Sequence, residues 1–337
     1  MSSVREPLST AEATQSSTRT ESLSDRLPAA GVWLALAALV AFNLVATDNF
    51  FAQQTVTTNL SQMASIVIAG VGMTYIMATG GIDLSVGSLM SLAGATAGLL
   101  LLSGVSLFTG GLIGVLLILV AAMLAAAAFG LVNGLLVGRL GIQPIVATLV
   151  LLIAGRGIAQ LVTNGRLFPI TNPDLLWLGR GTVLGFSSQA WIMLFVVAAA
   201  VWVARATVFG RQVVAVGGNE RAAGLAGVPV RRIKYAVYTI GGLLAGLAGL
   251  INASVNGTID TANLGLGYEF AVISAVVVGG TPLTGGRPKL LGTVGGAALI
   301  QLLTFTLASH NFPRETANLI QAAVIIAAVA LQRRRVV

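Results

Sequence analysis

The sequence predicts an all-α membrane protein with about ten transmembrane helices. Hydrophobic residues make up 56% of the 337 residues, whereas charged residues make up only 9%. A soluble domain of this length needs more charges to cover its surface. The apolar stretches are long enough for helices of about 20 residues, the length that crosses a bilayer. These observations together predict a polytopic membrane protein.

Hydropathy divides the chain into ten predicted spans. They lie at residues 29–46, 60–79, 85–103, 109–137, 143–163, 189–204, 235–256, 269–280, 290–309 and 316–332. The fourth is long for one crossing, so we expect it to tilt or to include an interfacial turn. Residues 1–28 are polar and rich in Ser and Thr, which predicts a disordered tail without a cleavable signal peptide. Residues 333–337 form a basic end, and 29–332 form the membrane domain.

The basic residues predict the orientation. With the amino terminus inside and the spans alternating, all but four of the 19 lysines and arginines fall in inner segments. The four are Arg166, Arg180 and Arg314 in outer loops, and Arg156 within a span. This is the positive-inside bias, and it predicts that both termini are cytoplasmic. The net charge of +8 is therefore a signal of topology and not of nucleic-acid binding.

Several enzymatic chemistries are excluded by composition. The chain contains no cysteine and one histidine, His310, so it cannot assemble a thiolate metal site or a Cys–His pair. Lys234 and Lys289 are its only lysines, and neither lies in a phosphate-binding loop of the Gly-x-x-x-x-Gly-Lys-Ser/Thr type. We expect a non-catalytic chain without a metal or cofactor of its own.

Two glycine-rich breaks interrupt the apolar pattern on the same side of the predicted topology. Residues 80–87 and 279–286 share the order Gly-Gly, two residues, Leu, a hydroxyl residue, one residue and Gly. Non-helical backbone at membrane depth is tolerated where it packs in protein or lines water, so we interpret the breaks as a hinge or gate. Asp83 could instead cap the third span, and the two roles are compatible. The candidate hinge residues are Gly80, Gly81, Asp83, Ser85, Gly279, Gly280 and Pro282.

One polar island, residues 205–234, lies between apolar spans. Asn219 is a plausible N-cap, Glu220 suits the start of a helix dipole, and Pro229 ends the segment. Its small residues give a slim surface that can sit in a groove on a soluble partner. The alternative is an interfacial helix on the lipid headgroups, which favours bulkier apolar anchors. The candidate coupling residues are Asn219, Glu220, Arg221, Ala222, Ala223 and Gly227.

Neutral polar residues within the spans are candidates for a path for an uncharged polyhydroxy solute. They include Asn133, Gln143, Thr148 and Gln160 in the fourth and fifth spans. The alternative for each is an interhelical hydrogen bond, worth about 0.6 kcal/mol on average in membranes. Arg156 could pair with a carboxylate, bind helix-end carbonyls or lie nearer the outer surface.

Four runs together resemble the ribose-type sugar permeases of the branched-chain amino acid/ribose superfamily of bacterial ABC importers. The resemblance covers roughly residues 30–332. It rests on ATGGIDLSVGS at 78–88, VGGNERAA at 216–223 with Gly227, YE at 268–269 and VGGTPLTGG at 278–286. Within that family, TNPDLLWLG at 171–179 and NFPRE at 311–315 resemble the galactofuranose-uptake branch.

The resemblance implies a type II ABC importer permease in the bacterial inner membrane. A periplasmic or lipid-anchored binding protein would deliver a monosaccharide, two identical or paralogous permeases would form the path, and ATPase subunits holding ATP-Mg would dock at 217–228. The rival hypothesis is an ion-coupled sugar transporter, which needs membrane-embedded carboxylates; only Asp83 and Glu269 qualify. A membrane scaffold, the third class, would not need broken helices.

Overall fold

The computed structural model is a bundle of helices. It describes residues 23–109, 111–313, 315–316, 318–320, 322–324 and 326. The predicted tail mostly precedes this range, and the predicted tenth span and basic end lie mostly beyond it. The long or apolar helices are α1 (Leu23–Ala46), α2 (Gln53–Ala78), α3 (Val86–Leu102), α5 (Gly111–Gly138), α6 (Pro144–Thr163), α8 (Ser188–Ala206), α11 (Val230–Asn256), α12 (Tyr268–Val278) and α13 (Leu290–Ser309).

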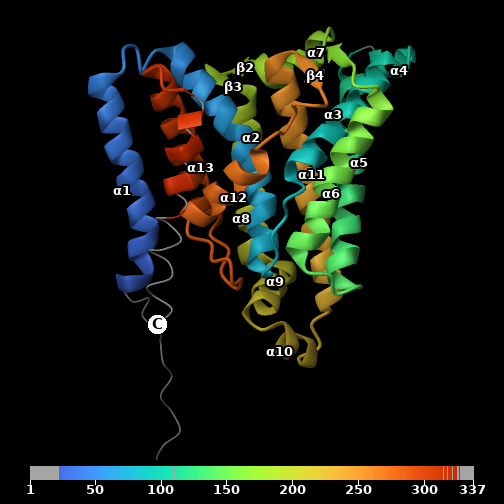
Figure 1. Ribbon diagram of the computed structural model, residues 1–337, viewed down its shortest axis with the longest axis vertical. Helices are drawn as coiled ribbons and strands as arrows, with labels where there is room; N and C mark the ends of the chain where they lie inside the picture. Colours follow the sequence, from blue (N-terminus) through green and yellow to red (C-terminus); the bar gives the residue numbers. More distant parts are fainter. Residues whose placement is uncertain are drawn as a thin grey trace, which may run out of the picture.

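Short elements cap the two ends of the bundle (Figure 1). At one end, here the strand end, lie α7 (Pro173–Arg180) and strands β2 (Thr182–Val183), β3 (Phe186–Ser187) and β4 (Thr258–Asp260). Strand β1 (Leu167–Pro169) pairs antiparallel with β4, and β2 pairs with β3. The short helix α4 (Ser106–Thr109) lies at the same end. At the other end, here the arm end, lie α9 (Val208–Gly218) and α10 (Glu220–Leu225).

Every predicted span that falls within the described residues is a helix. Six helices are long and apolar enough to cross a membrane, and parts of α1, α3 and α12 are shorter apolar helices. The long fourth span is the 28-residue α5, and the one-turn helix α4 precedes it. Helix α2 begins at Gln53 and not near residue 60, because its first turns are helical but polar.

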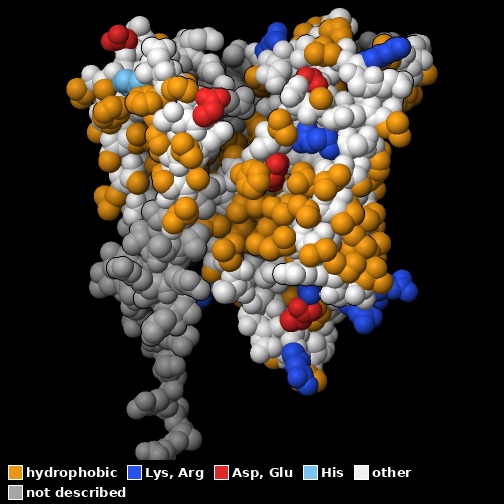
Figure 2. Space-filling view, in the orientation of Figure 1, with side chains coloured by type: hydrophobic (Ala, Val, Ile, Leu, Met, Phe, Trp, Pro, Cys, Tyr) orange, Lys and Arg blue, Asp and Glu red, His pale blue; other side chains and the backbone are white. Residues whose placement is uncertain are grey.

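The core is built around α2 and α11. The most apolar 18-residue stretch of α2 is 83% buried and that of α11 is 67% buried, compared with 17% for α8. Helices α5, α6 and α8 therefore turn most of their apolar side chains outward, and apolar side chains cover the middle of much of the face shown in Figure 2. This is the distribution expected of a bundle solvated by lipid, where the outside is as apolar as the inside.

Glycines set the spacing of the central helices. A Cβ added at Gly72 of α2 would lie 2.8 Å from Cα of Gly241 on α11. A Cβ added at Gly242 would lie 2.5 Å from the Ala126 carbonyl oxygen of α5. The backbones of α2, α5 and α11 therefore approach as closely as glycine allows, which is the usual route to helix association in membranes.

Two helices are too short to cross a bilayer. Helix α3 has 17 residues and α12 has 11, so they span about 25 Å and about 17 Å against a hydrocarbon core of about 30 Å. Both begin inside the protein, since Ser85 is fully buried and Glu269 is 5% exposed. Extended or turning backbone completes each crossing, as expected where irregular structure is covered by protein.

Candidate functional site

Helix α10 forms the tip of the arm end and has defined caps. Its N-cap is Asn219, as predicted, and the Asn219 side-chain oxygen accepts a hydrogen bond from the Ala222 amide at 2.9 Å. The helix ends at Leu225, and Gly227 has φ +82°, a conformation that residues with a Cβ rarely adopt. Asn219 and Gly227 therefore fix the length of this one-and-a-half-turn helix.

An ion pair ties α10 to the start of α11. Nζ of Lys234 lies 2.7 Å and 2.8 Å from the two carboxylate oxygens of Glu220. The Lys234 side chain is 14% exposed and that of Glu220 is 55% exposed. The sequence pattern predicts that Glu220 lies at the start of a helix dipole, but it does not indicate this partner, because the intervening turn at Pro229 brings Lys234 to it.

The exposed surface of α10 differs from the expected one. Ala223 is 6% exposed and holds the helix against the bundle, so it does not belong to the outer surface. Leu225, at the tip, is 86% exposed. Together with the exposed Ala222, Gly224 and Arg221 it gives a small apolar surface beside positive charge, a composition found at protein interfaces.

Helices α9 and α10 together form the arm. Near Gly217, at the end of α9, the arm contacts both glycine-rich breaks. A Cβ added at Gly217, near the end of α9, would lie 1.7 Å from the Ala78 carbonyl oxygen and 2.5 Å from the Gly286 nitrogen. The Gly286 amide donates to that same Ala78 oxygen at 2.8 Å. A Cβ at Gly285 would lie 2.9 Å from the Gly80 nitrogen. The two breaks were predicted to lie on the same side of the membrane. They contact each other and the arm at one junction, and the contacts there are made by backbone atoms.

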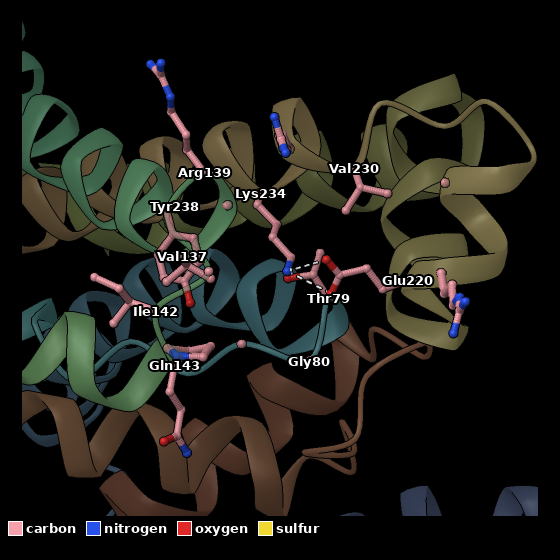
Figure 3. Close-up of a pocket in the computed structure, with 17 residues that line it drawn as sticks. Thr79, Gly80, Val137, Arg139, Ile142, Gln143, Glu220, Val230, Lys234 and Tyr238 are labelled. Atoms are coloured by element: carbon pink, nitrogen blue, oxygen red, sulfur yellow. Dashed lines mark hydrogen bonds and ion pairs between the residues drawn. The ribbon is translucent and has the colours of Figure 1, made fainter.

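A cavity of about 790 Å³ opens beside this junction (Figure 3). Thr79, Gly80 and Gly81 line it from the first break, and Glu220 and Lys234 point toward one another across it. Four further groups that carry charge or amides complete the lining: Arg139, Gln143, Arg221 and Arg231. Its charged lining suits a charged or protein partner more than a neutral solute.

The first break carries a buried polar chain. Oδ1 of Asp83 accepts hydrogen bonds from the backbone amide and the hydroxyl of Ser85, at 2.7 Å and 2.5 Å. The Ser85 hydroxyl in turn accepts one from Nδ2 of Asn133 on α5, at 2.8 Å. The N-cap of α3 is Ser85 and not Asp83, so Asp83 acts one step earlier by binding the amide of the cap residue.

The short helix α12 begins beside the start of the short helix α3. A Cβ added at Gly87, in the first turn of α3, would lie 2.2 Å from the Gly265 carbonyl oxygen just before α12. Glu269 lies in the first turn of α12, with its Oε2 2.6 Å from the same position. Two helix N-termini therefore meet inside the protein, each beside a buried carboxylate, the charge that a helix N-terminus stabilises.

Arg156 binds the irregular segment that precedes α12. Its Nη1 donates to the carbonyl oxygens of Ala262 at 2.7 Å and Leu264 at 3.4 Å, and its charge interacts with that of Glu269. Of the three alternatives for Arg156, the structure combines carbonyl binding with attraction to a carboxylate. Asp260 organises the same segment from the strand end, where the Asn263 amide and neighbouring backbone N–H groups hold the pKa of Asp260 below its usual range.

The four candidate path residues do not gather in one place. Asn133 and Thr148 are fully buried, and the Thr148 hydroxyl donates to the Pro144 carbonyl oxygen at 2.9 Å. Asn133 makes the hydrogen bond between elements that was the alternative, to Ser85, whereas the Thr148 bond lies within α6. Gln143 lines the arm-end cavity, whereas Gln160 lies toward the other end of α6.

A second cavity, of about 800 Å³, was not anticipated. It lies at the strand end, where α2 begins beside α7, β3 and α8. Its α2 residues are Gln53, Gln54, Thr57, Thr58, Ser61 and Gln62. Their spacing of four marks one helical face, which is a signal that the sequence does contain. It was missed because four of the six residues precede the predicted span at 60–79. Among the described residues, no group of His, Asp and Glu side chains could hold a metal ion.

A bundle with two broken helices and a protruding polar arm defines a polytopic membrane permease. The family model for "Branched-chain amino acid transport system / permease component" matches residues 55–329, and the chain belongs to this family. No solved structure matches it.

Curated relatives extend over most of the chain. It is 40% identical to the galactofuranose transporter permease protein YtfT of Escherichia coli (strain K12), over 82% of this chain and 79% of that protein. It is 37% identical to the ribose import permease protein RbsC of the same organism, over 90% and 92%. It is 34% identical to the fructose import permease protein FruF of Bifidobacterium longum (strain NCC 2705), over 83% and 77%.

Proposed function

We propose that this chain is the permease subunit of an ATP-driven importer that carries a monosaccharide across the bacterial inner membrane. Both termini and the arm face the cytoplasm, and the strand end faces outward. A separate ATPase with bound ATP-Mg docks on the arm, a sugar-binding protein docks on the strand end, and a second permease copy completes the path. The named activities of the relatives, import of galactofuranose, ribose and fructose, support the substrate class.

The junction at Gly217 is the observation that carries this proposal. A partner that moves α10 also moves α9. A Cβ at Gly217 of α9 would lie within 3 Å of backbone atoms at the ends of both breaks. The exposed Leu225 at the tip gives such a partner an apolar anchor. The fold therefore offers a short mechanical route from the surface to both breaks, which a permease without its own motor requires.

The interior favours a neutral substrate. In transporters with broken helices, half-helix N-termini can bind anionic groups of the substrate. Here the first turns of α3 and α12 already have the carboxylates of Asp83 and Glu269 beside them, and both are at least 95% buried. An anionic substrate would meet like charge at these positions, whereas a sugar would meet hydrogen-bonding groups.

Reconstitution in proteoliposomes tests the function. With the partner ATPase inside and a sugar-binding protein outside, uptake of radiolabelled galactose or ribose should require ATP and should persist when ionophores collapse ion gradients. Uptake by the purified chain alone, or uptake abolished by ionophores with ATP present, would contradict the proposal and favour an ion-coupled transporter.

A further inference from the structure

The strand-end cavity is built almost entirely from uncharged hydrogen-bonding side chains. The residues that α2 contributes, Gln53, Gln54, Thr57, Thr58, Ser61 and Gln62, are all amides or hydroxyls. Positions four apart repeat on one helix face, so these groups point to the same side over more than two turns. A volume of about 800 Å³ is within the range of small-molecule sites and exceeds that of one hexose.

Two buried side chains on the opposite wall have unsatisfied polar atoms. Ser187 is 3% exposed and Gln189 is fully buried, and both line the cavity from the start of α8. Oε1 of Gln189 accepts a hydrogen bond from the Ser61 hydroxyl at 3.2 Å. Among the described residues, Nε2 of Gln189 and Oγ of Ser187 have no partner. Buried polar atoms are rarely left unpaired, so these two indicate a ligand with both donors and acceptors.

The charges of the cavity narrow the ligand class. Arg180 is the one ionisable side chain among the lining residues, and its Nε donates to the Val255 carbonyl oxygen at 3.2 Å. The lining contains no carboxylate, so it has no group that attracts a cation. The arm-end cavity, by contrast, is lined by Glu220 and several basic residues. The two ends of the molecule therefore present chemically different cavities.

Part of the lining is held in place by a second polar layer. Gln62 accepts a hydrogen bond through its Oε1 from Nε2 of Gln301 on α13, at 2.6 Å, and Asn59 accepts one from the same nitrogen at 3.3 Å. The Ser61 hydroxyl also lies 2.8 Å from the Thr57 carbonyl oxygen. Such outer partners fix the orientation of the groups that line a site.

We infer that the strand-end cavity is an entry site for a neutral polyhydroxylated ligand, a monosaccharide, on the permease itself. The sugar hydroxyls would bind the amide and hydroxyl groups of α2 and satisfy the Gln189 amide and the Ser187 hydroxyl. This inference rests on the proposed function for the direction of transport. It adds that sugar contacts this chain directly at α2 and α8 before it reaches the helix breaks.

Protection from thiol labelling tests the inference directly. The chain has no cysteine, so Thr58→Cys places a single thiol in the cavity and Leu184→Cys places one on the exposed β2–β3 turn outside it. The assay uses right-side-out membrane vesicles that carry the full importer without binding protein, and a membrane-impermeant methanethiosulfonate reagent. For a site with a Kd of about 10 mM, galactose or ribose at about 10 to 100 mM should slow labelling at position 58 about 2- to 10-fold.

The controls separate the possible occupants. Labelling at position 184 should not change with sugar, and potassium glutamate at the same osmolarity should protect neither position. A parallel sample receives sugar-free binding protein. No protection of position 58 by sugar, equal protection by glutamate, or protection only by the added sugar-free binding protein would overturn the inference. The last outcome would make this surface a docking site for the binding protein.

Uptake measurements keep this inference separate from the proposed function. Thr58→Trp should place a bulky side chain on the face that lines the cavity and reduce ATP-driven uptake at least about tenfold, whereas Thr55→Val, at a position that does not line the cavity, should leave it unchanged. Normal uptake by Thr58→Trp with an active wild type would refute the entry site alone. Lack of ATP-driven uptake by the wild type would refute the proposed function.

Discussion

Gly217 is the residue at which the arm meets both helix breaks. Its neighbours there are backbone atoms, the Ala78 carbonyl oxygen and the Gly286 nitrogen, which cannot rotate away as a side chain could. Any side chain at position 217 must therefore separate α9 from the breaks. Overpacking of this kind costs about 1–3 kcal/mol.

We expect Gly217→Ala to reduce ATP-driven uptake by about tenfold or more while the protein still inserts into the membrane. Gly218→Ala is the matched control, because a Cβ at Gly218 meets nothing within 4 Å. Uptake and ATP hydrolysis in proteoliposomes measure the effect, and hydrolysis should continue without uptake. Equal uptake by the two variants would show that the junction carries no motion.

Residue-level features were predictable where they depend on near neighbours in the chain. The Asn219 cap follows from a side chain that binds an amide three residues on. The role of Gly217 depends on a carbonyl at Ala78, and the Glu220–Lys234 pair depends on the turn between them. No local pattern in the sequence records either contact.

Among the elements, the segment before α12 depends on a charge from another helix. Arg156 of α6 binds the carbonyl oxygens of Ala262 and Leu264 and is attracted to the buried Glu269. Arg156→Met would remove two charge-assisted hydrogen bonds and leave the Glu269 carboxylate buried without its cation. We expect a loss of about 3 kcal/mol in stability, measured as a lower Tm of the detergent-solubilised protein.

The double variant Arg156→Met/Glu269→Gln tests the cause. If the isolated carboxylate is responsible, neutralising it should recover a large part of the lost Tm. A double variant less stable than the single one would show that Glu269 has a separate structural role.

An ion pair between Glu220 and Lys234 helps to hold α10 of the arm in position. The Glu220 carboxylate lies within 3 Å of Nζ of Lys234. Glu220→Lys would therefore place a second ammonium group opposite that of Lys234. Like charges at this distance should displace α10 and lower uptake by about tenfold. Reversing both charges, Glu220→Lys/Lys234→Glu, should restore most of the uptake in the proteoliposome assay. If the double variant stays inactive, Glu220 acts by contacting the ATPase and not by holding α10.

Helices that cross the membrane were predictable because hydropathy alone specifies them. Helix α9 was not, since its buried positions Gly210, Val213 and Val216 form a narrow stripe within a polar segment. The meeting of α3 and α12 was also hidden, because Gly87 and Gly265 come from distant segments and touch through backbone only. The glycine-rich pattern identified the breaks, and the structure shows that they are in contact.

At the scale of the whole molecule, the two ends differ in chemistry in a way that fits directed transport. The strand end has a cavity of amides and hydroxyls, and the arm end has a charged cavity and an exposed apolar tip. Between them, the two half-helices close the interior with buried polar groups that are mostly bound to one another.

Orientation is the property on which this asymmetry depends. Leu225 on the arm and Leu184 at the strand end are 86% and 84% exposed, so both positions are equally open to a reagent. In the cysteine-free chain, an impermeant thiol reagent added to intact cells stripped of their outer membrane should label Leu184→Cys and not Leu225→Cys. In inside-out vesicles the result should reverse, because the basic residues near the arm predict a cytoplasmic location for that end. Labelling of Leu225→Cys from outside would mean that the orientation is the opposite of the predicted one. A cytoplasmic ATPase could then not reach the arm.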